Sequence, residues 1–341
     1  MVRINFNGLN ARDVFNKIVD KTKAFNSTDL STLDFEAKCD YALSCLTDAM
    51  PYTRQLPYSD FISITGEIIK RAVNGDAVGL YYLARFDRRI GVSYDDKIEY
   101  YKRASDMGYL PATVRYLRMC SNHEERYAIA KELVGKIPSI ESIPLRILAI
   151  KGCYDTLRRV EGKDKYPHRH DLTHDLYLDL AKDGDVDAPV WLEIIAKRKA
   201  RIGATEAERI AAQQEREFWQ TVNFMVTEHY FKLGITKHES SLAYMLMSGS
   251  GCERDVESGI HHALTNMRRT VAMLDRGVIM DTMAHVEARS EKRPLSAKLA
   301  AALLEGDDAA VEAIVADFKT RDDVAELFSG ASCMLSYGKY Q

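Results

Sequence analysis

The chain has 341 residues, a formal net charge of -3 and hydrophobic residues at 46% of its positions. A chain of this length can bury a sizeable core without disulfides or metals, and its nearly balanced charge disfavours a general binder of nucleic acid or anionic membranes. Its 8 prolines and few alternating β-branched stretches leave little room for a sheet, whereas Ala, Leu, Glu, Lys, Arg and Met fill long segments. The composition therefore predicts an all-α fold.

The cysteines and the first residues bear on the compartment. The 6 cysteines are scattered without a Cys-x-x-Cys pair, a pattern typical of reduced and mostly buried thiols. The N-terminus has no apolar run behind a basic start, and nowhere do eighteen uncharged apolar residues follow one another. We expect a cytoplasmic protein without membrane insertion, or an effector that is exported without a classical signal peptide.

The first predicted elements are three amphipathic helices over residues 10–25, 33–50 and 58–73. In each, apolar residues recur at three- and four-residue spacing, and Asn10 is placed to cap the first. Pro51 ends the second helix. We predict that residues 1–57 form an N-terminal helical region before the main array.

Residues 75–112 have the pattern of a complete helix-turn-helix unit. Small or apolar residues line one face of a helix until Gly91 interrupts it, and a second helix, capped by Asp95 or Asp96, runs to Gly108. Small residues at Ala84 and Ala104 favour close approach of the two helices. Because so short a hairpin cannot bury its apolar stripe alone, neighbouring hairpins are expected to stack on it.

Similar marks recur along the chain. Gly75 and Gly108 lie 33 positions apart, which is the length of a helical-hairpin repeat. A partial copy surrounds Gly184, and a good one follows Gly234. The copies are degenerate between residues 112 and 167, where the glycine loop is missing.

These stretches resemble Sel1-like repeats, which are related to tetratricopeptide repeats. The matching positions in the first copy are Leu83-Ala84, Gly91-Val92, Asp95, Tyr100-Tyr101, Ala104, Gly108 and Ala112, and those in the second are Leu242-Ala243, Tyr244, Gly249, Gly251, Asp255, Gly259 and Ala263. The resemblance covers about half of the chain. It implies a right-handed α-solenoid of helix pairs with non-repeat helical ends, and an adaptor, regulator or effector that binds another macromolecule.

Within this plan, residues 58–290 form the irregular repeat array and residues 291–341 form a helical cap with a loose tail. A charged helix over about 205–230, with Thr205 and Glu208 as its capping box, is predicted as an insertion projecting from the array. A long helix over residues 273–287 is expected before the cap. The final thirteen residues are predicted to be loose.

A histidine cluster is the strongest lead toward catalysis. His170 and His174 are four residues apart, so both imidazoles would share one face of a helix, and Asp171 or His168 is available as a further ligand. A metal-dependent enzyme that uses these histidines is the alternative function. The competing interpretation is a solvated helix start, because the Glu of an His-Glu-x-x-His motif is missing.

The main hypothesis is a non-catalytic scaffold that needs no cofactor. In stacked helix pairs the first helices line the concave face, and counting seven and ten positions past the marker glycines selects residues for that face. The selected residues are rich in Tyr, Trp and Arg, which dominate interface energetics, and they predict binding of a protein or peptide rather than nucleic acid. The predicted partner-binding residues are Tyr82, Arg85, Arg115, Arg118, Trp191 and Tyr244.

Overall fold

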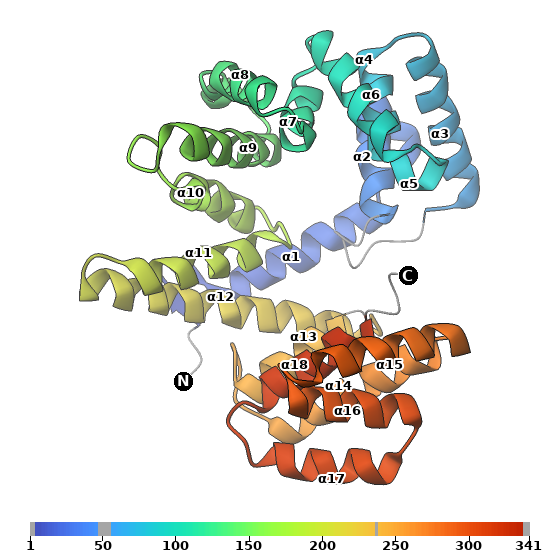
Figure 1. Ribbon diagram of the computed structural model, residues 1–341. Coiled ribbons are helices and arrows are strands. Elements are labelled where there is room, and N and C mark those ends of the chain that lie inside the picture. Colours follow the sequence, from blue (N-terminus) through green and yellow to red (C-terminus); the bar gives the residue numbers. More distant parts are fainter. Residues whose placement is uncertain (1–3, 47–55, 236–237, 337–341) are drawn as a thin grey trace. The chain divides into compact units, whose positions relative to one another are not determined.

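The structure is a computed structural model that describes residues 4–46, 56–235 and 238–336 (Figure 1). It confirms the all-α prediction. Within these ranges the only strands are β1 (Asn5–Phe6) and β2 (Leu9–Asn10), a short antiparallel hairpin in which Asn5 lies opposite Asn10. None of the helices described is both long and apolar enough to cross a membrane.

The chain divides into two compact units, each with its own contacts. The middle unit is residues 17–195, and the composite unit is residues 1–16 with residues 196–341. Helices α1 (Ala11–Asn26) and α11 (Ala188–Ile202) contain the two boundaries. The other helices of the middle unit are η1 (Leu30–Thr32), α2 (Phe35–Leu46), α3 (Tyr58–Val73), α4 (Ala77–Arg85), α5 (Asp87–Ile90), α6 (Tyr94–Asp106), α7 (Leu110–Met119), α8 (His123–Val134), η2 (Ile137–Ser139), α9 (Ile143–Glu161) and α10 (Arg169–Lys182). Those of the composite unit are α12 (Glu206–Lys232), α13 (Glu239–Ser248), α14 (Val256–Ala272), α15 (Arg276–Ser290), α16 (Pro294–Glu305), α17 (Asp308–Lys319) and α18 (Val324–Leu335).

The predicted hairpin over residues 75–112 is present as α4 to α6. Gly91 and Gly108 both adopt the left-handed conformation, with φ of 75° and 84°, and each ends a helix. Ala84 and Ala104 are fully buried where α4 packs on α6. The predicted cap was wrong by two or three positions, because the Ser93 hydroxyl accepts the N–H of Asp96 at 3.1 Å and α6 therefore begins at Tyr94.

Neighbouring helices of the middle unit pack in chain order, as stacked pairs should. Helix α3 packs on α4, α4 on α6, α6 on α7, and α9 on both α7 and α10, the succession visible in Figure 1. Two buried clusters follow this succession. One runs from Cys39 to Cys120 and the other from Val114 to Leu157. This arrangement fits an α-solenoid in general, while its handedness and its Sel1-like repeat type stay predictions.

The two units do not follow the predicted boundaries at residues 57 and 290. Cys39, Ala42 and Leu43 of α2 belong to the same buried cluster as the helices of the first hairpin. At the other end, α16 to α18 share one cluster with Ala243 and Ile260 of the second copy. The terminal helices thus share their buried cores with helices of the predicted array. The predicted helix end at Met50 and Pro51 lies outside the described residues.

Helix α12 is less solvated than a projecting insertion would be. The predicted capping box is confirmed, since the Thr205 hydroxyl accepts the N–H of Glu208 and the Glu208 carboxylate accepts that of Thr205. Residues 206–211 are exposed, but Phe218 and Trp219 at the middle of the helix are fully buried. The charged first turns suggested an external helix, but the later part of α12 belongs to the core of the composite unit.

Of two expectations for the C-terminal part, one was nearly right and one was wrong. The long helix predicted over residues 273–287 is present as α15, but it begins three residues later than predicted, because Asp275 caps it by accepting the N–H of Val278 at 2.9 Å. The expected loose tail begins too early, since α18 continues to Leu335, which is fully buried. Residues 337–341 lie outside the described ranges.

Gly184 offers a test of the packing in the middle unit. A Cβ at this position would lie 2.6 Å from the backbone oxygen of Lys17, and φ is 82°. Gly108 has a similar φ of 84° with open space around it. We expect Gly108→Ala to lower the free energy of unfolding by about 1–2 kcal/mol from the left-handed backbone alone. Gly184→Ala should lower it by about 1–3 kcal/mol more, because the new methyl group must displace α1.

Chemical denaturation of the two variants and the wild-type chain, followed by circular dichroism, measures this difference. Equal losses for the two variants would contradict the close approach at Gly184.

Candidate functional site

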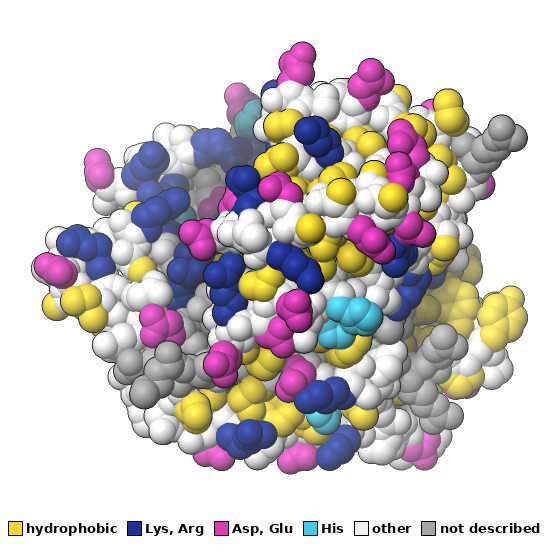
Figure 2. All heavy atoms as spheres, turned by 90° about the horizontal axis from the view of Figure 1, so that it is seen from below, with side chains coloured by type: hydrophobic (Ala, Val, Ile, Leu, Met, Phe, Trp, Pro, Cys, Tyr) yellow, Lys and Arg dark blue, Asp and Glu magenta, His cyan; other side chains and the backbone are white. Residues whose placement is uncertain are grey.

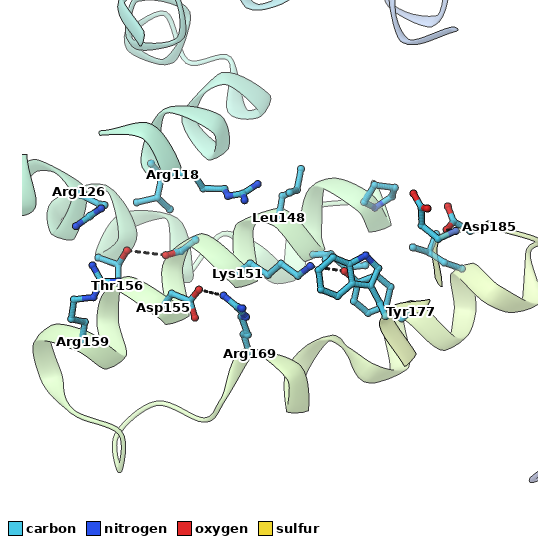
Figure 3. Close-up of a pocket in the computed structure, with 17 residues that line it drawn as sticks. Arg118, Arg126, Leu148, Lys151, Asp155, Thr156, Arg159, Arg169, Tyr177 and Asp185 are labelled. Carbon is cyan, nitrogen blue, oxygen red and sulfur yellow. Dashed lines mark hydrogen bonds and ion pairs between the residues drawn. The ribbon is translucent and has the colours of Figure 1, made fainter. Parts of the chain in front are cut away.

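A cavity of about 560 Å³ opens between α7, α9, α10 and α11 of the middle unit (Figure 3). We call it the basic cavity, because five cationic and three anionic side chains line it. The cations are Arg118, Arg126, Lys151, Arg159 and Arg169.

One face of α9 forms the floor of the basic cavity. The lining residues Leu148, Lys151, Asp155 and Arg159 follow one another at three- and four-residue spacing, so they share a single face of the helix. Other residues of α9, among them Cys153, are buried in the apolar cluster of this part of the unit. The alternation that makes α9 amphipathic thus places charged groups along the cavity.

A glycine sets how closely α7 approaches this floor. A Cβ at Gly152 would lie 2.9 Å from Leu117 Cδ2, so an alanine here would force the Leu117 side chain to shift. Arg118, the residue after Leu117, projects over the floor in Figure 3. Neither a hydrogen bond nor an ion pair of its guanidinium group is found among the described residues.

The start of α10 forms another side of the basic cavity. His168 caps this helix by accepting the N–H of His170 on its Nδ1 at 3.2 Å. The next residue, Arg169, forms an ion pair with Asp155 of the floor. Figure 3 shows the Arg169 side chain rising toward Asp155 and Lys151. Asp155 therefore compensates one of the cations that crowd this part of the cavity.

Two aromatic rings surround the amine of Lys151. Tyr177 and Trp191 stack with ring centroids 5.8 Å apart and planes inclined by 14°. Lys151 Nζ donates a hydrogen bond of 2.7 Å to the Tyr177 hydroxyl and lies 3.4 Å from the centroid of the Trp191 ring. The amine is held by one polar contact and one ring face, an arrangement that keeps it inside the cavity.

Burial and neighbouring cations lower the pKa of Lys151 to about 8, with Arg169 and Arg118 as the repelling charges and Asp155 opposing them. The Trp191 ring face, like Asp155, opposes this lowering, because it favours the ammonium form. Burial likewise lowers the pKa of Arg118, with Arg115 and Arg169 adding to the shift. Positive charge thus accumulates here beyond what the nearby carboxylate compensates.

The opposite end of the cavity is acidic. Asp185 and Asp187 lie in the loop between α10 and α11. Burial raises the pKa of the nearby Tyr177, and the negative charges of Asp185 and Asp187 raise it further. Asp185 also accepts the N–H groups of Asp187 and Ala188 at 3.0 and 2.9 Å, which anchors the start of α11. In Figure 3, Asp185 lies at the end away from Arg126 and Arg159. The cavity is therefore polarised along its length.

The structure brings together two of the six predicted partner-binding residues. Arg118 and Trp191, 73 positions apart in the chain, both line the basic cavity. Arg115 is half-buried and does not line it, although it is close enough to lower the pKa of Arg118. Tyr244 is 39% exposed in the composite unit, where its hydroxyl donates to Glu326 at 3.4 Å.

Tyr82 and Arg85 have packing roles in this structure. The Tyr82 ring is 1% exposed and its hydroxyl donates to the backbone oxygen of Glu36 at 3.2 Å. Arg85 forms an ion pair of 2.6 Å with Asp40. The positions counted from Gly75 therefore face α2 and not a partner, because the N-terminal helices cover the side of α4 that was expected to be open.

The predicted histidine cluster lies at the start of α10. His170 is 8% exposed, with its ring 4.7 Å from that of His168, while His174 Nδ1 is 2.9 Å from Asp175 Oδ1. In the part of the chain that the structure describes, no group of three or more His, Cys, Asp or Glu side chains is arranged to hold a metal ion. His168 acts as the cap of this helix.

Sequence reasoning missed most of the cavity. Lys151, Asp155 and Arg159 lie in the stretch where the repeat pattern is degenerate, so no marker glycine fixed their register. A signal was present nonetheless, because Lys151, Asp155 and Arg159 recur at four-residue spacing and so share one face of the helix.

Comparison with models of known protein families, with curated proteins and with solved structures finds no match to this chain.

The pKa of Lys151 gives a direct test of this geometry. We expect its amine to titrate near pH 8, well below the ordinary value of a lysine, because burial and two guanidinium groups disfavour the charged form. Since the folded pKa lies below the unfolded one, the unfolded chain binds more protons between about pH 8 and 10.5, and stability rises with pH across that window. NMR of reductively ¹³C-methylated protein, with Lys151→Arg to assign the signal, measures the titration.

Lys131 is the internal control, because its hydrogen bond with Glu161 raises its pKa. A Lys151 midpoint above pH 10 would contradict the environment described for the amine.

Proposed function

We propose that this protein is a non-catalytic scaffold that binds a protein or peptide partner, and that the basic cavity is the site of binding. The observation that carries the proposal is the convergence of Arg118, Lys151 and Trp191 from three helices on one hollow. Arginine and aromatic residues supply a large part of the binding energy at protein interfaces. An open cavity that combines both is suited to anchoring a side chain of a partner.

The stacked helices support the same proposal. Helix pairs that pack only on their neighbours present an extended inner surface, and the residues on it are free to vary with the partner. The resemblance of two stretches to Sel1-like repeats points in this direction, since that family is rich in adaptors. We therefore propose an adaptor, regulator or effector, acting in the cytoplasm or after export.

A general electrostatic binder of nucleic acid is a poorer fit. On the face of the molecule in Figure 2, acidic and hydrophobic side chains are interspersed among the Lys and Arg side chains. The formal net charge of the chain is -3. Phosphate backbones bind to continuous basic surfaces, whereas the basic groups of interest here are confined to one hollow with a carboxylate among them.

A quantitative pull-down tests the site. The full chain is used as bait, and the variant Arg118→Ala/Trp191→Ala is compared with wild type by mass spectrometry. We expect recovery of a specific partner to fall at least about tenfold, because truncating central Arg and Trp residues removes more than 1 kcal/mol each from typical interfaces. Arg158→Ala is the matched control, because Arg158 lies on α9 but outside the cavity.

Tyr244→Ala asks whether the composite unit is involved instead. If this variant loses the partner while the cavity variant retains it, the proposed site is wrong. Circular dichroism of each variant shows whether the helices remain folded.

A further inference from the structure

We propose that the arginine-rich end of the basic cavity binds a phosphate monoester. This inference rests on the proposed function, because the partner would carry the phosphate on a side chain. The carriers of the site are Arg118 from α7, Lys151 from α9 and Arg169 from the start of α10, with Arg126 and Arg159 at the rim (Figure 3).

The excess positive charge at this end favours a ligand with two negative charges over one with a single negative charge. Five cations line the cavity, and Asp155 is the carboxylate on the same face of α9. The two other lining carboxylates belong to the loop beside Tyr177, at the opposite end. A glutamate or aspartate side chain would neutralise one charge, whereas a phosphate monoester brings a charge near -2 and three acceptor oxygens.

The donors present match those acceptors. Guanidinium groups bind phosphate oxygens in a bidentate manner, and an ammonium group adds a compact point charge. Arg118 has no hydrogen-bonding partner among the described residues, so a phosphate binds to it without displacing another contact. Arg169 keeps one contact, its ion pair with Asp155, which holds the guanidinium beside the cavity.

Lys151 also gains from such a ligand. Its amine is depressed in pKa by burial and by the charges of Arg169 and Arg118. An incoming anion reverses the sign of that local field and favours the ammonium form. The Tyr177 hydroxyl and the Trp191 ring face hold the amine on the side of the acidic loop, so a phosphate approaches it from the arginine side.

Trp191 supplies a built-in reporter. The chain contains two tryptophans, and the second, Trp219, is fully buried in the composite unit. In a Trp219→Phe background, fluorescence therefore reports on the cavity alone. Where this substitution impairs folding, calorimetry on the native sequence provides the same comparison.

The experiment titrates this protein with six probes. They are a degenerate peptide mixture with a fixed central phosphoserine, the same mixture with serine, the same mixture with glutamate, free O-phosphoserine, inorganic phosphate and a single-stranded oligonucleotide. We expect the phosphoserine mixture to bind at least tenfold more tightly than the serine and glutamate mixtures. Arg118→Ala and Arg169→Ala should each weaken this binding at least tenfold, and Arg158→Ala should leave it unchanged.

Equal binding of the phosphoserine and glutamate mixtures, or binding that is insensitive to Arg118→Ala, would overturn the inference. Free O-phosphoserine that binds as tightly as the peptide mixture supports the phosphate site and assigns a small ester as its source. A single-stranded oligonucleotide that binds more tightly than every monoester would also overturn it, in favour of a phosphodiester.

Phosphatase treatment of the lysate separates this inference from the proposed function. If the treatment abolishes partner recovery in the pull-down, both stand. If partner recovery survives the treatment but is lost in Arg118→Ala/Trp191→Ala, the cavity binds a partner through other groups and the phosphate inference fails alone.

Discussion

The structure depends on one constraint: its helices are too short to bury their apolar faces unless a neighbour covers them. Helix α4 has 9 residues and α7 has 10, and isolated helices of this length are marginal in water. Each is stabilised by the next helix along the chain, which requires close approach at small residues such as Ala84, Ala104 and Gly152. A helix face that no neighbour covers remains open to solvent.

The basic cavity forms because this stacking leaves the charged face of α9 to line a hollow. The helix is covered on one side by the apolar cluster of Val114 to Leu157, while Lys151 and Asp155 on its other side line the cavity. Like charges from α7 and α10 are then brought close to the Lys151 amine. Repulsion of this kind disfavours the empty state, and it favours a bound anion for the same electrostatic reason.

Under the proposed function, binding in the cavity would be coupled to the stability of the middle unit. The ion pair of Arg169 with Asp155 and the contact of Lys151 with Tyr177 connect α9 to α10, while Trp191 extends the wall to α11. A ligand that bridges Arg118 and Arg169 would add a link between α7 and α10. A bound partner is accordingly expected to stabilise the same packing that forms its site.

The sequence by itself determined the helices and many of their ends. Periodicity placed the apolar stripes, glycines at Gly91 and Gly108 marked helix ends, and Thr205 with Glu208 gave the start of α12, because these signals act within a few residues. It also selected Arg118 and Trp191. Only the tertiary structure decided which helix faces remain open: α2 covers Tyr82 and Arg85, α18 is buried where a loose tail was expected, and Lys151 joins the cavity. The physical reason is that periodicity assigns residues to a face, whereas exposure of that face depends on which distant helix packs against it.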